Sequence, residues 1–205
     1  MPLVPDTVGE DDARDDARER IFAVAEAEFR RVGFHATTMD VVARQAGCSK
    51  KTIYKLFESK EALFFLLLNR FKATLKNMEI DPGLPPGPAL EDLLFRMAGV
   101  MLCEDAISTL RMVLAEYGAN PSLVASAERH FGGGIGALER YLALLEQEGG
   151  YRFGPTEEAA RMLIGMALGA FHYERLVAML PALPEAMLRA RIHKAVAIFL
   201  KGCQA

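Results

Sequence analysis

One short stretch of the chain combines cationic, hydroxyl and apolar side chains: GCSKKTIYKLFESKEALF, residues 47–64. The whole chain has 205 residues and a formal net charge of −3, yet residues 45–60 contain a single acidic residue. The same segment holds four lysines, which are Lys50, Lys51, Lys55 and Lys60. Ammonium groups pair with phosphate oxygens and can donate to acceptors on a guanine base. Such a local cluster predicts a surface that binds a polyanion, although the charge alone would also be consistent with a solvated lysine face.

Two short helices separated by a glycine would present these side chains. Thr38 can cap a helix over residues 39–46, and Gly47 can end it. Ser49 can cap a second helix over residues 50–57. Two short helices joined by a tight turn that contains glycine are typical of a helix-turn-helix, whose second helix can enter the major groove of DNA.

Apolar residues recur at helical spacing along the rest of the chain, and no alternating strand pattern is present. A first helix should run from about residue 12 to residue 32 and stop at Gly33. A fourth helix is predicted over residues 60–77. The proline and glycine content of residues 81–88 predicts a loop there, and five further helices follow. We therefore predict an all-α fold of about nine helices.

These elements suggest three regions along the chain. Residues 1–13 are acidic and are expected to form a disordered tail. Residues 14–62 are expected to form a three-helix, helix-turn-helix DNA-binding domain. Residues 63–205 are expected to form a helical regulatory domain that binds a ligand and dimerises.

Composition limits the class of protein. The longest uncharged apolar stretch, residues 162–173, is shorter than the roughly 20 residues of a membrane-spanning helix. The acidic start lacks the apolar run of a signal peptide. Three scattered cysteines, Cys48, Cys103 and Cys203, form neither a disulfide framework nor a zinc pattern. We expect a cytoplasmic protein with no membrane, metal or cofactor partner, and the absence of common catalytic motifs argues against an enzyme.

Residues 18–64, RERIFAVAEAEFRRVGFHATTMDVVARQAGCSKKTIYKLFESKEALF, resemble the DNA-binding domain of the TetR/AcrR family of transcriptional regulators. Farther along, LRMVLAEYGANPSLVASAERHF resembles the regulatory domain of the AcrR/AefR-like branch. The resemblance implies a homodimer that reads a palindromic operator on double-stranded DNA. Members of the family usually repress transcription.

Eight residues are candidates for contact with DNA. The resemblance implies phosphate contacts for Thr38, Tyr54 and Lys60. The remaining candidates lie at the start of the second helix or along it, where they can reach base edges or phosphates. The full set is Thr38, Ser49, Lys50, Lys51, Thr52, Tyr54, Lys55 and Lys60. Asp40 departs from relatives that carry a basic residue there; it either completes a helix cap or accepts a hydrogen bond from a cytosine amine.

A ligand cavity is expected among the helices near residues 90–117, 121–148 and 160–175. Its candidate lining is Met97, Met101, Arg111, Met112, Tyr117, His130, Phe131 and His172. Methionines suit a permissive apolar pocket, but at helical spacing they also form ordinary core. Arg111 either holds a ligand carboxylate or forms an ion pair. The run Gly132–Gly134 either lets the domain flex or marks a local break.

The dimer interface is expected on the two apolar helices near residues 161–176 and 186–200, which would form half of a four-helix bundle between subunits. Gly165 and Gly169 permit close helix approach, either within the chain or across the interface. The candidate interface residues are Met162, Gly165, Met166, Gly169, Tyr173, Leu188, Ile192, Ala195 and Phe199.

Together, the residues and the resemblance predict a ligand-responsive homodimeric repressor released from its operator by a small, largely apolar effector. A metal- or redox-responsive regulator that uses Cys48, Cys103, His130 or His172 remains an alternative. A helical small-molecule enzyme is the second alternative.

Overall fold

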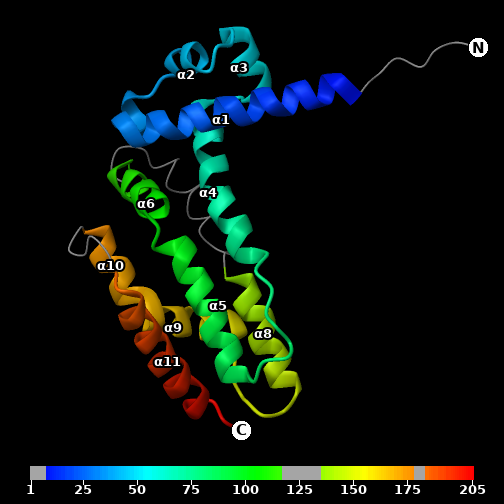
Figure 1. Cartoon of the computed structure of the whole chain (residues 1–205), viewed down its shortest axis with the longest axis vertical. Coiled ribbons are helices and arrows are strands. Elements are labelled where there is room, and N and C mark those ends of the chain that lie inside the picture. The colour runs from blue at the N-terminus through cyan, green and yellow to red at the C-terminus, as the bar shows by residue number, and fades with distance from the viewer. Residues whose placement is uncertain (1–7, 117–134, 178–182) are drawn as a thin grey trace, which may run out of the picture.

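The computed structural model describes residues 8–116, 135–177 and 183–205, which fold into helices arranged in two units (Figure 1). The first unit consists of α1 (Val8–Ala36), α2 (Met39–Gln45) and α3 (Lys50–Leu56). From it α4 (Lys60–Lys76) leads to the second unit. The second unit contains α5 (Pro86–Met101), α6 (Glu104–Glu116), α8 (Gly136–Gln147), α9 (Thr156–Ile164), η1 (Gly165–Gly169), α10 (Ala170–Leu176) and α11 (Glu185–Gly202). The predicted all-α fold is confirmed, with nine helices in the described ranges when the consecutive α9, η1 and α10 count as one.

Apolar residues along α1 build the core of the first unit. Ile21 is fully buried, and the rings of Phe29, Phe34 and Phe64 lie with centroids 5.0 to 5.7 Å apart. Gly33 leaves helical geometry with a φ of 85°, which glycine adopts without steric cost, and so turns the chain toward α2. The helix begins at Val8, earlier than the predicted start and inside the segment expected to be a tail.

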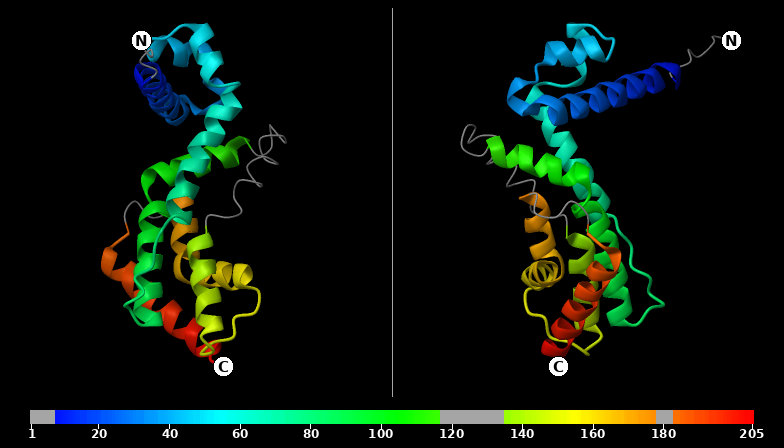
Figure 2. Two further views of the ribbon diagram at one scale, coloured as in Figure 1. Left: turned by 90° about the vertical axis from the view of Figure 1, so that its right-hand side faces the viewer. Right: turned by 60° about the vertical axis from the view of Figure 1, so that its left-hand side comes forward.

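Helix α4 takes part in both units (Figure 2). Its first half buries Leu63, Phe64 and Leu67 in the core of the first unit. Near its end, Leu75 packs against the core of the second unit. A displacement of α4 would therefore be felt in both units.

Helix α5 begins inside the segment predicted to be a loop. Pro86 occupies its first turn, and the preceding Pro85 stands at the cap position. A proline is tolerated there because the first N–H groups of a helix have no carbonyl partner within it. The prediction that residues 81–88 avoid a helix is therefore wrong for residues 86–88.

The second unit is held together by contacts between helices distant in sequence. Helix α5 packs along α11, α8 packs against α9, and η1 lies against α11. Helix α6 crosses to the first unit, where Met112 and Val113 join its core. Of the helices in the described ranges, none is long and apolar enough to cross a membrane.

Candidate nucleic-acid interface and ligand cavity

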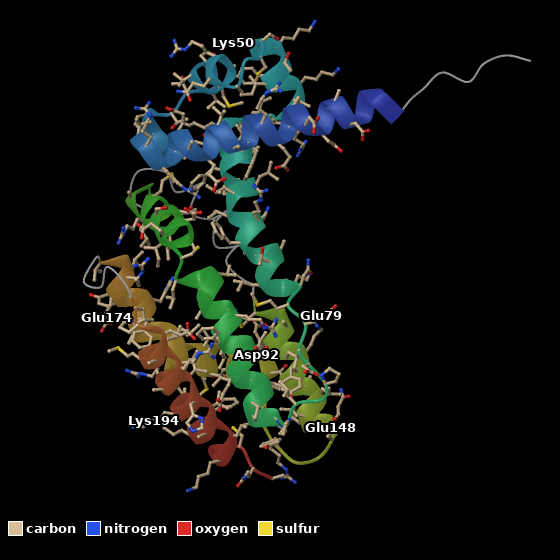
Figure 3. The ribbon with its side chains drawn as sticks, in the orientation of Figure 1. Lys50, Glu79, Asp92, Glu148, Glu174 and Lys194 are labelled. Carbon is tan, nitrogen blue, oxygen red and sulfur yellow. The ribbon has the colours of Figure 1, made fainter. Side chains whose placement is uncertain are left out.

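Helix α3 turns its cations to solvent. Ile53 is buried beneath the helix, whereas Lys51, Tyr54 and Lys55 are exposed. Figure 3 shows Lys50 at the end of the molecule farthest from the second unit, pointing outward. The exposed side of α3 can therefore approach a DNA groove without obstruction from the second unit.

The predicted hydroxyl residues hold the starts of the two short helices. Thr38 Oγ1 accepts a hydrogen bond from the Val41 N–H at 3.3 Å and caps α2. Ser49 Oγ accepts from the Thr52 N–H at 3.0 Å, and it lies 2.8 Å from Thr52 Oγ1. Gly47, with a φ of 66°, makes the turn between the helices. These caps fix the orientation of α3 relative to α2.

An acidic side chain shares the face that carries the lysines. Asp40, in the first turn of α2, accepts a hydrogen bond from Lys50 Nζ at 2.8 Å. Both side chains are exposed. This hydrogen bond, with the nearby negative charge, raises the pKa of Lys50. The first lysine of α3 is thus neutralised by a partner that local sequence patterns did not predict.

Lys60 points into the first unit. Its Nζ donates to the carbonyl oxygens of Phe34 at 2.8 Å and Thr37 at 2.9 Å, with a longer contact to that of His35 at 3.4 Å. The ammonium also lies 4.3 Å from the centre of the Phe34 ring. These contacts hold the start of α4 against the turn between α1 and α2. The phosphate contact implied by the resemblance would compete with them and stays a prediction.

Two further ties between α1 and α2 were not among the predicted residues. The buried Glu28 carboxylate accepts two hydrogen bonds from Arg31, each 2.9 Å long, and one from Gln45 at 2.8 Å. The bonds from Arg31, and then that from Gln45, lower the pKa of Glu28. Arg20 Nε donates to the Ala46 carbonyl at 3.0 Å. The sequence pattern that could have indicated this contact is the position of Glu28 on the otherwise apolar face of α1.

A cavity of about 210 Å³ lies among α4, α5, α6, α8 and α10. Its described lining is Leu68, Phe71, Lys72, Leu75, Val100, Met101, Ala106, Thr109, Leu110, Ile135 and His172. Only Met101 and His172 of the predicted lining residues are among them. The polar members Lys72 and Thr109 were missed, because single polar residues at helical spacing do not reveal which side of a helix borders a cavity.

The other predicted pocket residues have different positions. Met97 is buried in the core of the second unit, and Met112 in that of the first. Arg111 caps the end of α10 by donating to the carbonyl oxygens of Arg175 at 2.6 Å and Leu176 at 2.8 Å. The remaining residues predicted near the pocket lie outside the described ranges: Tyr117, His130, Phe131 and Gly132–Gly134.

An apolar face formed by α9, η1, α10 and α11 is exposed. Its large exposed side chains are Met162, Met166, Tyr173, Met187 and Ile198. A groove on this face is bordered by Met166 and Phe171 on one side and by Met187 and Ile198 of α11 on the other. Arg191 and Lys194 of α11 also line this groove. The π-helical turn η1 also exposes Gly165 and Gly169 there. We call this surface the η1–α11 face.

The predicted interface residues divide between this face and the core. Those on α9, η1 and α10, namely Met162, Gly165, Met166, Gly169 and Tyr173, are all exposed. Those on α11, namely Leu188, Ile192, Ala195 and Phe199, lie in the core of the same chain, each with at most 9% of its surface exposed. A stripe at helical spacing identifies the side that a helix buries, but not whether another chain covers it. The exposed side of α11 carries Met187 and Ile198 instead.

Few features of the described residues suit a metal. Within these ranges no three His, Cys, Asp or Glu side chains come close enough together to hold an ion. Cys48, Cys103 and Cys203 form no disulfide. Cys103 Sγ instead accepts a hydrogen bond from the Ala106 N–H at 3.4 Å, near the start of α6.

Two family models match separate parts of the chain. Residues 21–67 match the model for bacterial regulatory proteins of the tetR family. Residues 88–202 match the model for the C-terminal domain of AefR-like transcriptional repressors.

Curated relatives match over shorter stretches. The transcriptional regulator YhgD of Bacillus subtilis is 38% identical over 76 residues, which cover 34% of this chain and 38% of YhgD. The regulator Rv1556 of Mycobacterium tuberculosis is 31% identical over 113 residues, covering 54% of this chain and 52% of Rv1556. The transcriptional activator FasR of Mycolicibacterium smegmatis is 39% identical over 57 residues, covering 28% of this chain and 26% of FasR. The chain thus aligns with about half or less of the length of these relatives.

Solved structures match over nearly the whole chain. The flavonoid-responsive regulator FrrA has a TM-score of 0.78 and 27% identity, covering 93% of this chain and 98% of FrrA. SmeT in complex with triclosan has a TM-score of 0.66 and 25% identity, covering 93% and 92% of the two chains. A TetR-family regulator from Mesorhizobium loti has a TM-score of 0.77 and 23% identity, covering 94% and 98%, and this likeness concerns the fold alone. With both family models matched in order along it, the chain belongs to the TetR family of DNA-binding transcriptional regulators.

Proposed function

We propose that the protein is a homodimeric repressor that leaves a palindromic operator when a small, largely apolar effector binds. One observation carries this proposal: α4 and α6 border the apolar cavity and also pack into the core of the DNA-binding unit. A ligand in the cavity would therefore touch the two helices that can move that unit. The match to AefR-like repressors and the likeness to FrrA and to triclosan-bound SmeT support the same function.

Dimerisation is needed because one short helix buries too little surface for selective binding. Two copies of α3 about 34–36 Å apart would fit successive major grooves on one side of the duplex. The η1–α11 face is the candidate interface, because it exposes large apolar side chains from two adjacent helical segments. A second copy of the same face would cover it and complete a four-helix bundle.

The proposed switch is an equilibrium between two dimer shapes. Without effector, the two α3 helices have operator spacing; bound effector favours a shape with a different spacing. A 100-fold loss of DNA affinity requires the effector to prefer the second shape by about 2.7 kcal/mol, which lies within usual allosteric coupling. A bacterial regulator of this kind would act in the cytoplasm, where the chromosome lies.

Selection of bound duplexes from a random pool tests the DNA part of this proposal. We expect a palindrome whose half-sites lie about one helical turn apart. Operator affinity is then titrated with small apolar compounds, and binding of each compound is measured separately by calorimetry. A compound that binds the cavity should weaken operator binding. The switch is contradicted if compounds bind the protein and leave operator affinity unchanged.

The relative FasR gives one reason to test the sign of regulation, since FasR is named an activator. A reporter gene placed behind the selected operator should be silenced by the protein and restored by the effector. Higher reporter output in the presence of the protein would instead indicate activation.

A further inference from the structure

One oppositely charged pair lies on the outer surface of the helix-turn-helix. Asp40 Oδ2 and Lys50 Nζ are 2.8 Å apart, and 61% of the Asp40 side chain and 64% of that of Lys50 are exposed. Asp40 is in the first turn of α2, and Lys50 is the first residue of α3. Thr38 Oγ1 accepts the hydrogen bond that caps α2, while the Asp40 carboxylate bonds to Lys50. The carboxylate is therefore available at the surface rather than used in the cap.

This pair lies at the part of a helix-turn-helix that meets base edges. Residues at the start of the second helix contact the bases, whereas the first helix crosses the DNA backbone. Asp40 belongs to the first helix of the motif, but its carboxylate lies against Lys50 and so reaches the same place. A carboxylate next to phosphate is repelled, so a position facing the bases suits it better than one facing the backbone.

The pair presents a hydrogen-bond acceptor and a donor side by side. Lys50 Nζ has three N–H groups, of which Asp40 accepts one, and the carboxylate has further lone pairs. In the major groove, a Watson–Crick pair shows an amine donor and a carbonyl acceptor that are joined by an N–H···O bond and so lie about 2.9 Å apart. The 2.8 Å between the two side chains matches this spacing.

The groups beside the amine and the carbonyl favour C·G over A·T. In a C·G pair, cytosine N4 can donate to Asp40, and the guanine O6 and N7 acceptors lie together for Lys50. In an A·T pair, adenine N7 stands beside the amine and repels the carboxylate, and the thymine methyl hinders approach of the ammonium to O4. The reversed pair, G·C, would place the carboxylate against guanine O6. The edge that fits is C·G with cytosine toward Asp40.

We propose that Asp40 and Lys50 together read one C·G base pair in each half-site, so that Asp40 is a specificity-determining residue outside the recognition helix. The carboxylate accepts a hydrogen bond from cytosine N4, and Lys50 donates to guanine O6 and N7 of the same pair. This inference rests on the proposed function, because it names one base pair of the proposed operator. The ion pair holds both side chains before DNA binds, so less side-chain freedom is lost on contact.

Selection of bound duplexes from a random pool, with the full chain, is the first part of the test. We expect one position of each half-site to be C·G. Replacing that pair by T·A, A·T or G·C should weaken binding about tenfold or more, as measured by fluorescence anisotropy. 7-Deazaguanine at the same pair removes the N7 acceptor and should weaken binding severalfold. These measurements use the unmodified protein.

Variants identify the side chains that read the pair. Asp40→Asn and Lys50→Met should both relax the preference at the same position and leave the other positions unchanged. An Asn amide suits N6 and N7 of adenine, so Asp40→Asn should shift the preference there toward A·T. Lys50→Met should bind the 7-deazaguanine duplex and the ordinary one almost equally. Both side chains are exposed, and thermal melts should show an unchanged Tm for both variants.

Two controls separate base reading from a change in charge. Glu58→Gln removes an exposed negative charge from the same unit, and Lys51→Met removes an exposed positive charge from α3. Each is expected to alter overall affinity at most and to keep the preference for C·G at that position. A purely electrostatic role for Asp40 would give the same pattern for Asp40→Asn as for Glu58→Gln.

The outcomes distinguish this inference from the proposed function. The inference is overturned if Asp40→Asn and Lys50→Met select the same sequence as the unmodified protein, or if they relax different positions. Selection of a single half-site in which both variants relax one C·G pair would support the inference and contradict the dimer. A protein with no base preference at all would contradict both.

Discussion

At the scale of single residues, the candidate DNA-binding face carries both cationic side chains and an acidic one. Asp40 holds Lys50 in a hydrogen-bonded ion pair on the exposed side of the first unit. A lysine paired in this way neutralises DNA phosphate less effectively and so releases fewer counterions from the DNA. The carboxylate beside it also repels phosphate. We infer that Asp40 limits non-specific affinity, so that the protein depends more on contacts with the right bases.

Asp40→Asn should therefore tighten binding to a random duplex severalfold. The plot of log affinity against log salt should steepen by about 0.9 if the released Lys50 neutralises one further phosphate. Fluorescence anisotropy at several salt concentrations measures both quantities. Asp92→Asn is the control, because Asp92 forms a comparable pair with Arg96 on α5, remote from Lys50 (Figure 3). Unchanged affinity and slope in Asp40→Asn would refute this role.

Glu28 predicts how the stability of the protein depends on pH. Its pKa in the folded protein is below the ordinary value of 4.5, mainly because of the hydrogen bonds from Arg31. Its stabilising contribution is therefore fully present above about pH 4.5 and is lost as the pH falls through the lower folded pKa. Thermal melts should show a shallower fall in Tm below about pH 4.5 for Glu28→Gln than for the unmodified protein. The exposed Glu58 serves as control, and equal slopes for Glu28→Gln and Glu58→Gln would contradict the assignment.

At the scale of elements, Lys60 connects α4 to the turn between α1 and α2. Because its ammonium donates to the carbonyls of Phe34 and Thr37, Lys60→Met should lower Tm by several degrees in the absence of DNA. Lys51→Met provides the matched comparison, since Lys51 is exposed on α3 and should affect DNA affinity but not Tm. Differential scanning fluorimetry and duplex binding measure the two effects. A Lys60→Met protein with normal Tm and a reduced salt slope would favour the phosphate contact instead.

Sequence patterns predicted the elements that depend on local signals. The caps Thr38 and Ser49 and the break at Gly33 are set by neighbours in the chain, and the structure confirms them. The roles of Lys60 and Arg111 depend on backbone carbonyls far along the chain, which no local pattern contains. The apolar stripe of α11 is buried, but against α5 and η1 of the same chain. Which side of α11 stays exposed depends on this packing, which the sequence pattern does not contain.

At the scale of the whole molecule, the cores of the two units are built partly from the same helices. Helix α4 contributes to both, and α6 places Met112 and Val113 in the core of the first unit while Ala106 and Leu110 border the cavity. Arg30 on α1 and Asp105 on α6 add an ion pair of 2.8 Å between the units. Under the proposed function, a change in the cavity would therefore reach the DNA-binding unit through these packed helices.

The η1–α11 face, as the proposed dimer interface, would let this coupling act on two DNA half-sites. Ile198 has 53% of its surface exposed within the groove of that face, so a charge there should be tolerated by the folded chain but not by an apolar interface. Ile198→Glu should shift the protein from dimer to monomer in sedimentation experiments, with little change in Tm when compared at low concentration.

The same variant should lose affinity for the selected palindrome far more than for a random duplex, because one α3 helix can still contact phosphates but two are no longer held at operator spacing. Leu144→Glu is the control: Leu144 on α8 is similarly exposed, at 47%, but lies outside the groove. If Ile198→Glu remains dimeric and binds the palindrome normally, the subunits must associate elsewhere. The coupling between cavity and DNA would then have to pass through a different surface.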